Sequence, residues 1–193
     1  LKLSTTFGLQ MKQGKIYIIS GPSGVGKTTI CKELCNHIPR LRWSISATTR
    51  PQRLGEINGR DYYFLTQKQF SIKVEQNEFL EHAQVHGNYY GTPIAPIQQG
   101  LEQGDSYLLE IDVQGAYKIQ QSKIFQAVYI FIAPPDWTTL EERLIKRNTD
   151  DSETIRKRLQ RAREELEEQN FYHHIIINNK LEQAIQDVHN IIA

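Results

Sequence analysis

Residues 21–28 carry the residue types and spacing that say most about the chemistry of this chain. They read Gly-Pro-Ser-Gly-Val-Gly-Lys-Thr and match G-x-x-x-x-G-K-[ST], between an apolar stretch at 15–20 and a helical stretch at 29–34. Glycines in this order let backbone N–H groups turn inward toward an anion. A helix that begins at the same point adds the positive end of its dipole. The pattern therefore predicts a nucleoside triphosphate site.

Each part of this loop has an expected role. Lys27 would reach the β- and γ-phosphates, and the Thr28 hydroxyl would ligate Mg²⁺. The residues expected to contact the triphosphate are Gly21, Pro22, Ser23, Gly24, Val25, Gly26, Lys27, Thr28 and Thr29.

The elements that must position this loop alternate in the manner of an α/β protein. The strands are expected at 16–20, 107–112, 127–133 and 175–177. The helices are expected from the loop to 37, from 114 onward, over most of 136–170, and at 181–192. Such short apolar runs suit buried parallel strands and cannot cross a bilayer. We therefore predict a central parallel sheet.

Bulk composition indicates an ordinary globular protein. The 193 residues are 39% hydrophobic with a net charge of +1, enough for one good-sized core with a smaller insertion. This balance gives no global field that would attract nucleic acid or a membrane. We interpret Cys31 and Cys35 as small buried residues of a helix in a reducing compartment. Residues 1–13 are expected to be a disordered extension without a signal peptide, which predicts a cytoplasmic protein.

The pattern of residue types changes between residues 44 and 97. Turn residues there separate short aromatic or polar strands, which predicts an inserted β-rich unit. Its motifs, together with the strand end that follows, are Ser44–Arg50, Arg53, Gly55-Glu56, Asn58-Gly59, Asp61-Tyr62, Phe79–Glu81, Gly87–Pro93 and Leu109–Gly115.

In this order behind a phosphate loop, these motifs closely resemble those of the guanylate kinase family, from about Gly14 to the C-terminus. The resemblance implies a P-loop three-layer α/β fold with a parallel-sheet core (14–43, 98–135 and 161–193), a β-rich GMP-binding domain (44–97) and a helical lid (136–160). It also implies reversible transfer of the γ-phosphoryl group of ATP to GMP, and to dGMP, with Mg²⁺. The implied partners are GMP and ATP, without nucleic acid or membrane; an oligomer is compatible with the sequence, which does not specify one.

The resemblance assigns residues of the insert to the phosphate of GMP. Arg50 and Arg53 supply planar bidentate forks for a dianion. Ser46, Tyr62 and Tyr90 add hydroxyl donors. Relative to the family pattern, Pro51 stands one place early between the two arginines, so the chain path there is expected to differ.

The resemblance assigns base recognition to Glu81, Thr92 and Asp112. Guanine offers N1–H and an N2 amino group as donors, which two carboxylates can accept, and the Thr92 hydroxyl can donate to O6. Adenine has no N2 amine and no N1–H, so it would leave buried carboxylate oxygens unpaired.

Two further residues have two interpretations each. Glu110 ends a strand beside the phosphate loop, where it either organises Mg²⁺ through water or holds an arginine in place. Asn178 follows the last strand, where it contacts adenine by resemblance or serves a cap or turn.

The lid arginines complete the predicted machinery. Together with Lys27, the resemblance assigns Arg143, Arg147 and Arg158 to the transferring phosphoryl group, where such charges are worth about 10³–10⁵ in rate. We interpret Arg161 and Arg163 instead as a solvated face with i,i+4 pairing such as Arg161–Glu165.

Two alternative functions stay open at this point. A scaffolding domain of the same fold would bind a peptide without catalysis, but such domains typically lose the residues that match Lys27, Thr28 and Arg143. A sister kinase acting on a phosphorylated sugar would have little reason to keep Glu81, Thr92 and Asp112 together.

Overall fold

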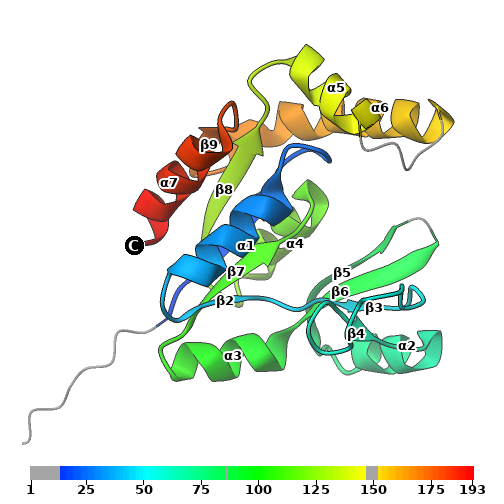
Figure 1. Cartoon of the computed structure of the whole chain (residues 1–193). Helices are drawn as coiled ribbons and strands as arrows, with labels where there is room; N and C mark the ends of the chain where they lie inside the picture. Colours follow the sequence, from blue (N-terminus) through cyan, green and yellow to red (C-terminus); the bar gives the residue numbers. More distant parts are fainter. Residues whose placement is uncertain (1–13, 86, 147–151) are drawn as a thin grey trace, which may run out of the picture.

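The structure is a computed structural model that describes residues 14–85, 87–146 and 152–193. The predicted extension at 1–13 and the predicted catalytic Arg147 lie outside the described residues. Figure 1 shows a central sheet flanked by helices, with the small inserted sheet on one side of it and helices α5 and α6 on another.

The central sheet is parallel throughout. Its strands follow the spatial order β2-β7-β1-β8-β9. The bounds are β1 Ile16–Ser20, β2 Leu41–Trp43, β7 Ser106–Glu110, β8 Ala127–Ala133 and β9 His174–Ile177. Ile19 of β1 pairs with Glu110 of β7, so the phosphate loop after β1 and the acid that ends β7 lie side by side at the carboxyl edge.

Helices cover both faces of this sheet, and the strand period of two decides which residues they meet. Tyr17 and Ile19 pack in one core with helices α1 (Lys27–His37) and α7 (Leu181–Ile192). Ile16 and Ile18 pack in a second core with helices α3 (Ile94–Glu102) and α4 (Val113–Ser122). This arrangement confirms the predicted three-layer α/β fold.

The insert forms a second sheet of order β4-β3-β6-β5. Its strands are β3 Ala47–Thr48, β4 Tyr63–Phe64, β5 Phe79–Val85 and β6 Asn88–Pro93. The sequence analysis missed helix α2 (Gln67–Glu75) here. Phe70 of α2 is buried and stacks on Phe79, with ring centroids 4.6 Å apart. Thr66 and Gln69 form a capping box at the start of α2, a signal that could have revealed it.

The lid region contains α5 (Trp137–Lys146), α6 (Ser152–Glu167) and a short 3₁₀ helix, η1 (Glu168–Phe171). Leu140 and Leu144 of α5 are buried in the core shared with α1. Helix α6 is continuous across the predicted 160/161 boundary, and α3 across 97/98, so these domain divisions stay predictions. Within the described ranges, no helix combines the length and apolar character needed to span a membrane.

Candidate active site

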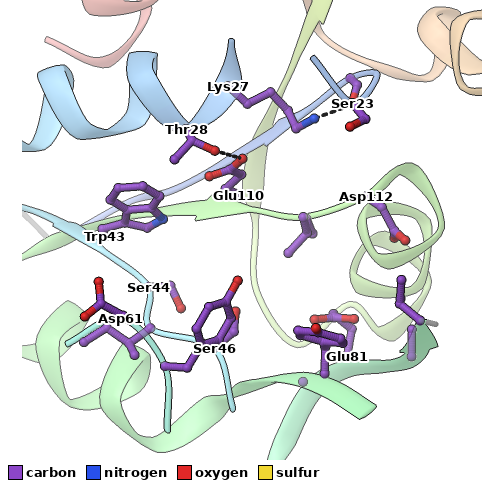
Figure 2. Close-up of a pocket in the computed structure, with 18 of the residues that line it drawn as sticks. Ser23, Lys27, Thr28, Trp43, Ser44, Ser46, Asp61, Glu81, Glu110 and Asp112 are labelled. Atoms are coloured by element: carbon purple, nitrogen blue, oxygen red, sulfur yellow. Dashed lines mark hydrogen bonds between the residues drawn. The ribbon is translucent and has the colours of Figure 1, made fainter. Parts of the chain in front are cut away.

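A cleft of about 630 Å³ lies where the phosphate loop, the end of β7, the inserted sheet and helix α6 face one another. Figure 2 shows Ser23, Lys27 and Thr28 on one wall and Ser46, Asp61 and Glu81 on the opposite wall. The predicted site residues that line the cleft are Gly21, Ser23, Lys27, Thr28, Ser46, Tyr62, Glu81, Tyr90, Glu110, Asp112 and Arg158. Half of the predicted site residues are therefore brought together in this cleft.

The Lys27 side chain folds back onto the phosphate loop that carries it. The Lys27 ammonium donates to the carbonyl oxygens of Gly21 at 2.5 Å and Pro22 at 3.0 Å. Both acceptors are neutral, and a phosphate oxygen is a stronger partner for an ammonium group. We therefore expect a bound triphosphate to draw Lys27 away from these carbonyls.

Asn178 supports the loop from the end of β9. Its buried side-chain amide donates to the Val25 carbonyl at 2.7 Å, and its backbone N–H donates to Ala133 at 2.8 Å. Arg143 donates to the Asn178 carbonyl at 3.1 Å, which brings this lid arginine to the same point. These contacts join segments far apart in the sequence and are not those of a local cap or turn, and the contact of Asn178 with adenine stays a prediction.

Gly26→Ala is expected to destabilise this loop. Gly26 has a φ of 100°, and a Cβ there would lie 2.6 Å from the Asn178 amide nitrogen. Positive φ alone costs a non-glycine residue about 1–3 kcal/mol, and the close approach to Asn178 adds to this cost; each kcal/mol lowers the Tm of a chain of this size by roughly 2–4 °C. Thermal denaturation and ATP titration would measure the losses. Gly55→Ala is the matched control, because Gly55 also has positive φ but has no heavy atom within 4 Å of the new Cβ. Equal losses in both variants would contradict the contact with Asn178.

Thr28 and Glu110 contact each other beside the phosphate loop. The Thr28 hydroxyl donates to a Glu110 carboxylate oxygen at 2.7 Å, shown dashed in Figure 2. Hydroxyl and carboxylate oxygens are ligands that suit Mg²⁺. Among the described residues no three His, Cys, Asp or Glu side chains group as a metal cluster. An ion at this point would therefore take further ligands from phosphate and water.

Only part of the predicted phosphate-binding set lines the cleft. Ser46, Tyr62 and Tyr90 line the cleft. Arg50 and Arg53 do not line it. The Arg50 guanidinium donates to Glu56 at 2.7 Å, and the backbone N–H of Arg53 donates to the other Glu56 oxygen at 2.7 Å.

The ion pair between Arg50 and Glu56 keeps both groups charged at the edge of the cleft. The hydrogen bond from Arg50 lowers the pKa of Glu56, and that same bond raises the pKa of Arg50. Glu56 itself lines the cleft. Binding of a dianionic phosphate by Arg50 therefore requires the guanidinium to leave or share Glu56.

The two carboxylates predicted to recognise guanine converge on Gly115. Asp112 is the N-cap of α4 and accepts the Gly115 N–H at 2.8 Å. A Cβ on Gly115 would lie 3.2 Å from a Glu81 carboxylate oxygen and 3.3 Å from an Asp112 oxygen. Gly115 thus leaves room for the paired acids, a role that the sequence analysis did not assign.

Thr92 lies behind Glu81. It is 1% exposed, and its hydroxyl donates to Glu81 at 2.7 Å. Burial raises the pKa of the Glu81 carboxyl, the Thr92 bond lowers it, and Asp112 raises it. In this arrangement the Thr92 proton orients Glu81, and its donation to guanine O6 stays a prediction.

Helix α6 contributes two residues that the sequence analysis did not place in the site. Arg161 pairs with Glu165 at 3.2 Å, as predicted, but it also lines the cleft and donates to Asp112 at 2.7 Å. Its interpretation as part of a solvated face is therefore wrong. Arg158, Arg161 and Glu165 all line the cleft, and their i, i+3, i+7 spacing could have revealed the shared face. Arg163 is exposed and lies over Trp137, 4.7 Å from the ring centroid.

This combination defines a class of protein. A phosphate loop at the carboxyl edge of a parallel sheet faces a second unit rich in hydroxyls and acids, with helix-borne arginines beside the cleft. This is the arrangement of a P-loop nucleoside monophosphate kinase.

Comparison with known proteins gives the family. A family model described as "Guanylate kinase" matches residues 13–193. The guanylate kinase of Carboxydothermus hydrogenoformans is 46% identical over 183 residues, covering 95% of this chain and 89% of that protein. That of Desulfitobacterium hafniense is 40% identical over 184 residues, covering 95% and 92%. The crystal structure of guanylate kinase from Anaplasma phagocytophilum matches with a TM-score of 0.76 at 33% identity, covering 94% of this chain and 85% of that one. The chain belongs to the guanylate kinase family.

Proposed function

We propose that this chain catalyses the reversible transfer of the γ-phosphoryl group from ATP to GMP. The observation that carries the proposal is one cleft that holds both a phosphate loop with Lys27 and the paired carboxylates Glu81 and Asp112. The first complements a triphosphate, and the second complements the two donor groups of guanine. The family uses ATP as phosphoryl donor and GMP as acceptor.

In this reaction the protein aligns the donor and acceptor phosphates and neutralises charge on the transferring phosphoryl group. A GMP phosphate oxygen attacks the γ-phosphorus in line, forming one P–O bond while the bond to the β,γ-bridging oxygen breaks. No general base is required because the attacking oxygen is already an anion. Lys27, Arg143 and Arg158 neutralise charge on the transferring group, while Ser46, Tyr62 and Tyr90 hold the acceptor phosphate with Arg50 and Arg53.

The same cleft suits a magnesium ion. Thr28 would ligate it directly and Glu110 through water, since the two side chains are already 2.7 Å apart beside the loop. When bound, the ion supplies positive charge to the β- and γ-phosphates.

A coupled assay with MgATP and each of GMP, dGMP, AMP, CMP and UMP tests this function. GMP is expected to be preferred over AMP by roughly 10⁴-fold in kcat/KM, because AMP leaves the buried carboxylates unpaired. Equal activity on AMP and GMP would contradict base recognition by Glu81 and Asp112. Absence of phosphorylation of every nucleotide would contradict the phosphotransferase.

The pH dependence of GMP binding provides a test of Glu81. Burial raises its pKa, so protonation on acidification removes an acceptor for guanine at a higher pH than for an exposed glutamate. The KM for GMP should therefore rise as pH falls through this raised pKa. The phosphate of GMP also titrates, at about pH 6, and would contribute to the same pH dependence. Thr92→Val separates the two effects, because it removes the hydrogen bond that lowers the Glu81 pKa. The acid limb of KM should move to higher pH in this variant, and an unmoved limb would contradict the role of Glu81.

A further inference from the structure

We propose that Arg161 is a positioning residue of the GMP site, which holds Asp112 ready for guanine and connects that carboxylate to lid helix α6. The inference rests on the proposed function, because Asp112 is taken there as an acceptor for guanine.

The first argument is geometric. One Asp112 oxygen accepts the Gly115 N–H of α4 at 2.8 Å, and the other accepts Arg161 from α6 at 2.7 Å. Arg161 and Asp112 are 49 positions apart in the sequence, so this bond joins two separate elements. Both oxygens of the acid are thereby fixed in direction, and its orientation depends on α6 as well as on its own helix.

The second argument concerns how Arg161 is itself held. Its Nε donates to Glu165 at 3.2 Å, while Nη2 donates to Asp112. A guanidinium is planar, so two carboxylates on different nitrogens fix its plane, which an ammonium group could not achieve. The Arg161 side chain is 42% exposed and lies on the wall of the cleft.

The third argument is the concentration of negative charge. Glu81, Asp112 and Glu165 all line the cleft, and Arg161 stands between two of them. Burial raises the pKa of Glu165, and Lys27 and Arg161 lower it. Lys118 likewise lowers the pKa of Glu81. Without Arg161, the acids would lose the cation that directly bonds two of them.

A consequence follows for GMP. A carboxylate oxygen has more than one acceptor position, so Asp112 can accept a guanine N–H while Arg161 stays bound. Arg161 then strengthens guanine binding without touching the transferring phosphoryl group. Its removal should change the KM for GMP much more than kcat.

Calorimetric titration of Arg161→Met with GMP, IMP and ATP tests the inference. The variant loses a hydrogen bond between charged groups, so its Kd for GMP should rise about 10–100-fold. Its Kd for ATP should change by less than about 3-fold. IMP lacks the N2 amine, so the preference for GMP over IMP should also fall. Arg161→Lys should recover part of the affinity. Lys157→Met is the matched control, because Lys157 lies on the same helix and is 70% exposed beside Glu153.

A double-mutant comparison makes the outcome specific. In an Asp112→Asn background, Arg161→Met should weaken GMP binding by less than about 3-fold more, because the partner is already lost. If Arg161→Met does not fold, Glu165→Gln removes one of the two acids that orient the guanidinium and should raise the Kd for GMP in the same sense. Unchanged or tighter GMP binding by the foldable variants would overturn the inference. If the unaltered chain phosphorylates GMP, such a result overturns this inference alone; if it does not, the proposed function fails.

Discussion

Lys27→Met is expected to lower kcat by about 10²–10³-fold, the loss typical when one preorganised charge or donor is removed from a transition state. Lys27 is the first residue of α1, and its ammonium already lies at the loop carbonyls that would surround a triphosphate. Methionine keeps most of the aliphatic length but cannot neutralise charge on the β- and γ-phosphates. A 10³-fold loss corresponds to roughly 4 kcal/mol of the activation barrier.

Steady-state and single-turnover kinetics with saturating GMP would measure this effect. Lys32→Met is the control, because Lys32 is an exposed residue of the same helix that does not line the cleft. Thermal denaturation of both variants would check that they stay folded, because the lost bonds of Lys27 are made to carbonyls of the buried residues Gly21 and Pro22. A kcat within about tenfold of the unaltered chain would contradict the assignment of Lys27 to the transferring group.

The core could be predicted from sequence because local signals agree there. The apolar run 127–133 forms β8 at the same residues, and the regular pattern at 181–192 forms α7 at the same residues. The phosphate loop follows from its motif and from the strand and helix beside it. In such segments propensity, periodicity and tertiary packing favour one structure.

Helix α2 shows where local signals fail. It has 9 residues, and its single buried residue, Phe70, is stabilised by stacking on Phe79 and Tyr89. Those rings come from strands β5 and β6, so nothing within 67–75 specifies the burial. The capping box at Thr66 and Gln69 marks only where the helix begins.

The site was predictable in its residue types but not in its partners. Motifs indicated Glu81, Glu110 and Asp112, whereas their hydrogen-bond partners depend on how distant segments meet. The amide of Asn178 reaches Val25 across 153 positions of sequence. The i,i+4 pair of Arg161 with Glu165 could be predicted from helical spacing, but its bond to Asp112 could not. Tertiary geometry therefore converts a surface arginine into a cleft residue.

Arg158→Met is expected to lower kcat by about 10³-fold or more, within the range for arginines that stabilise a transferring phosphoryl group. Arg158 lines the cleft from α6, one helical turn before Arg161. Its charge is expected to act on the equatorial oxygens of the transition state, so binding of the two ground-state nucleotides should change little. Arg161→Met should show the opposite pattern, with weakened GMP binding and a nearly unchanged kcat.

Comparison of the two variants by kcat and by calorimetric Kd for GMP separates catalysis from positioning on a single helix. Arg156→Met is the matched control, because Arg156 is exposed on α6 and does not line the cleft. If Arg158→Met loses GMP affinity by the same factor as kcat/KM, Arg158 belongs to acceptor binding. An unchanged kcat would remove it from the reaction. A selective loss of kcat in Arg158→Met, with a selective loss of GMP affinity in Arg161→Met, requires that α6 present two arginines with different tasks to the same cleft.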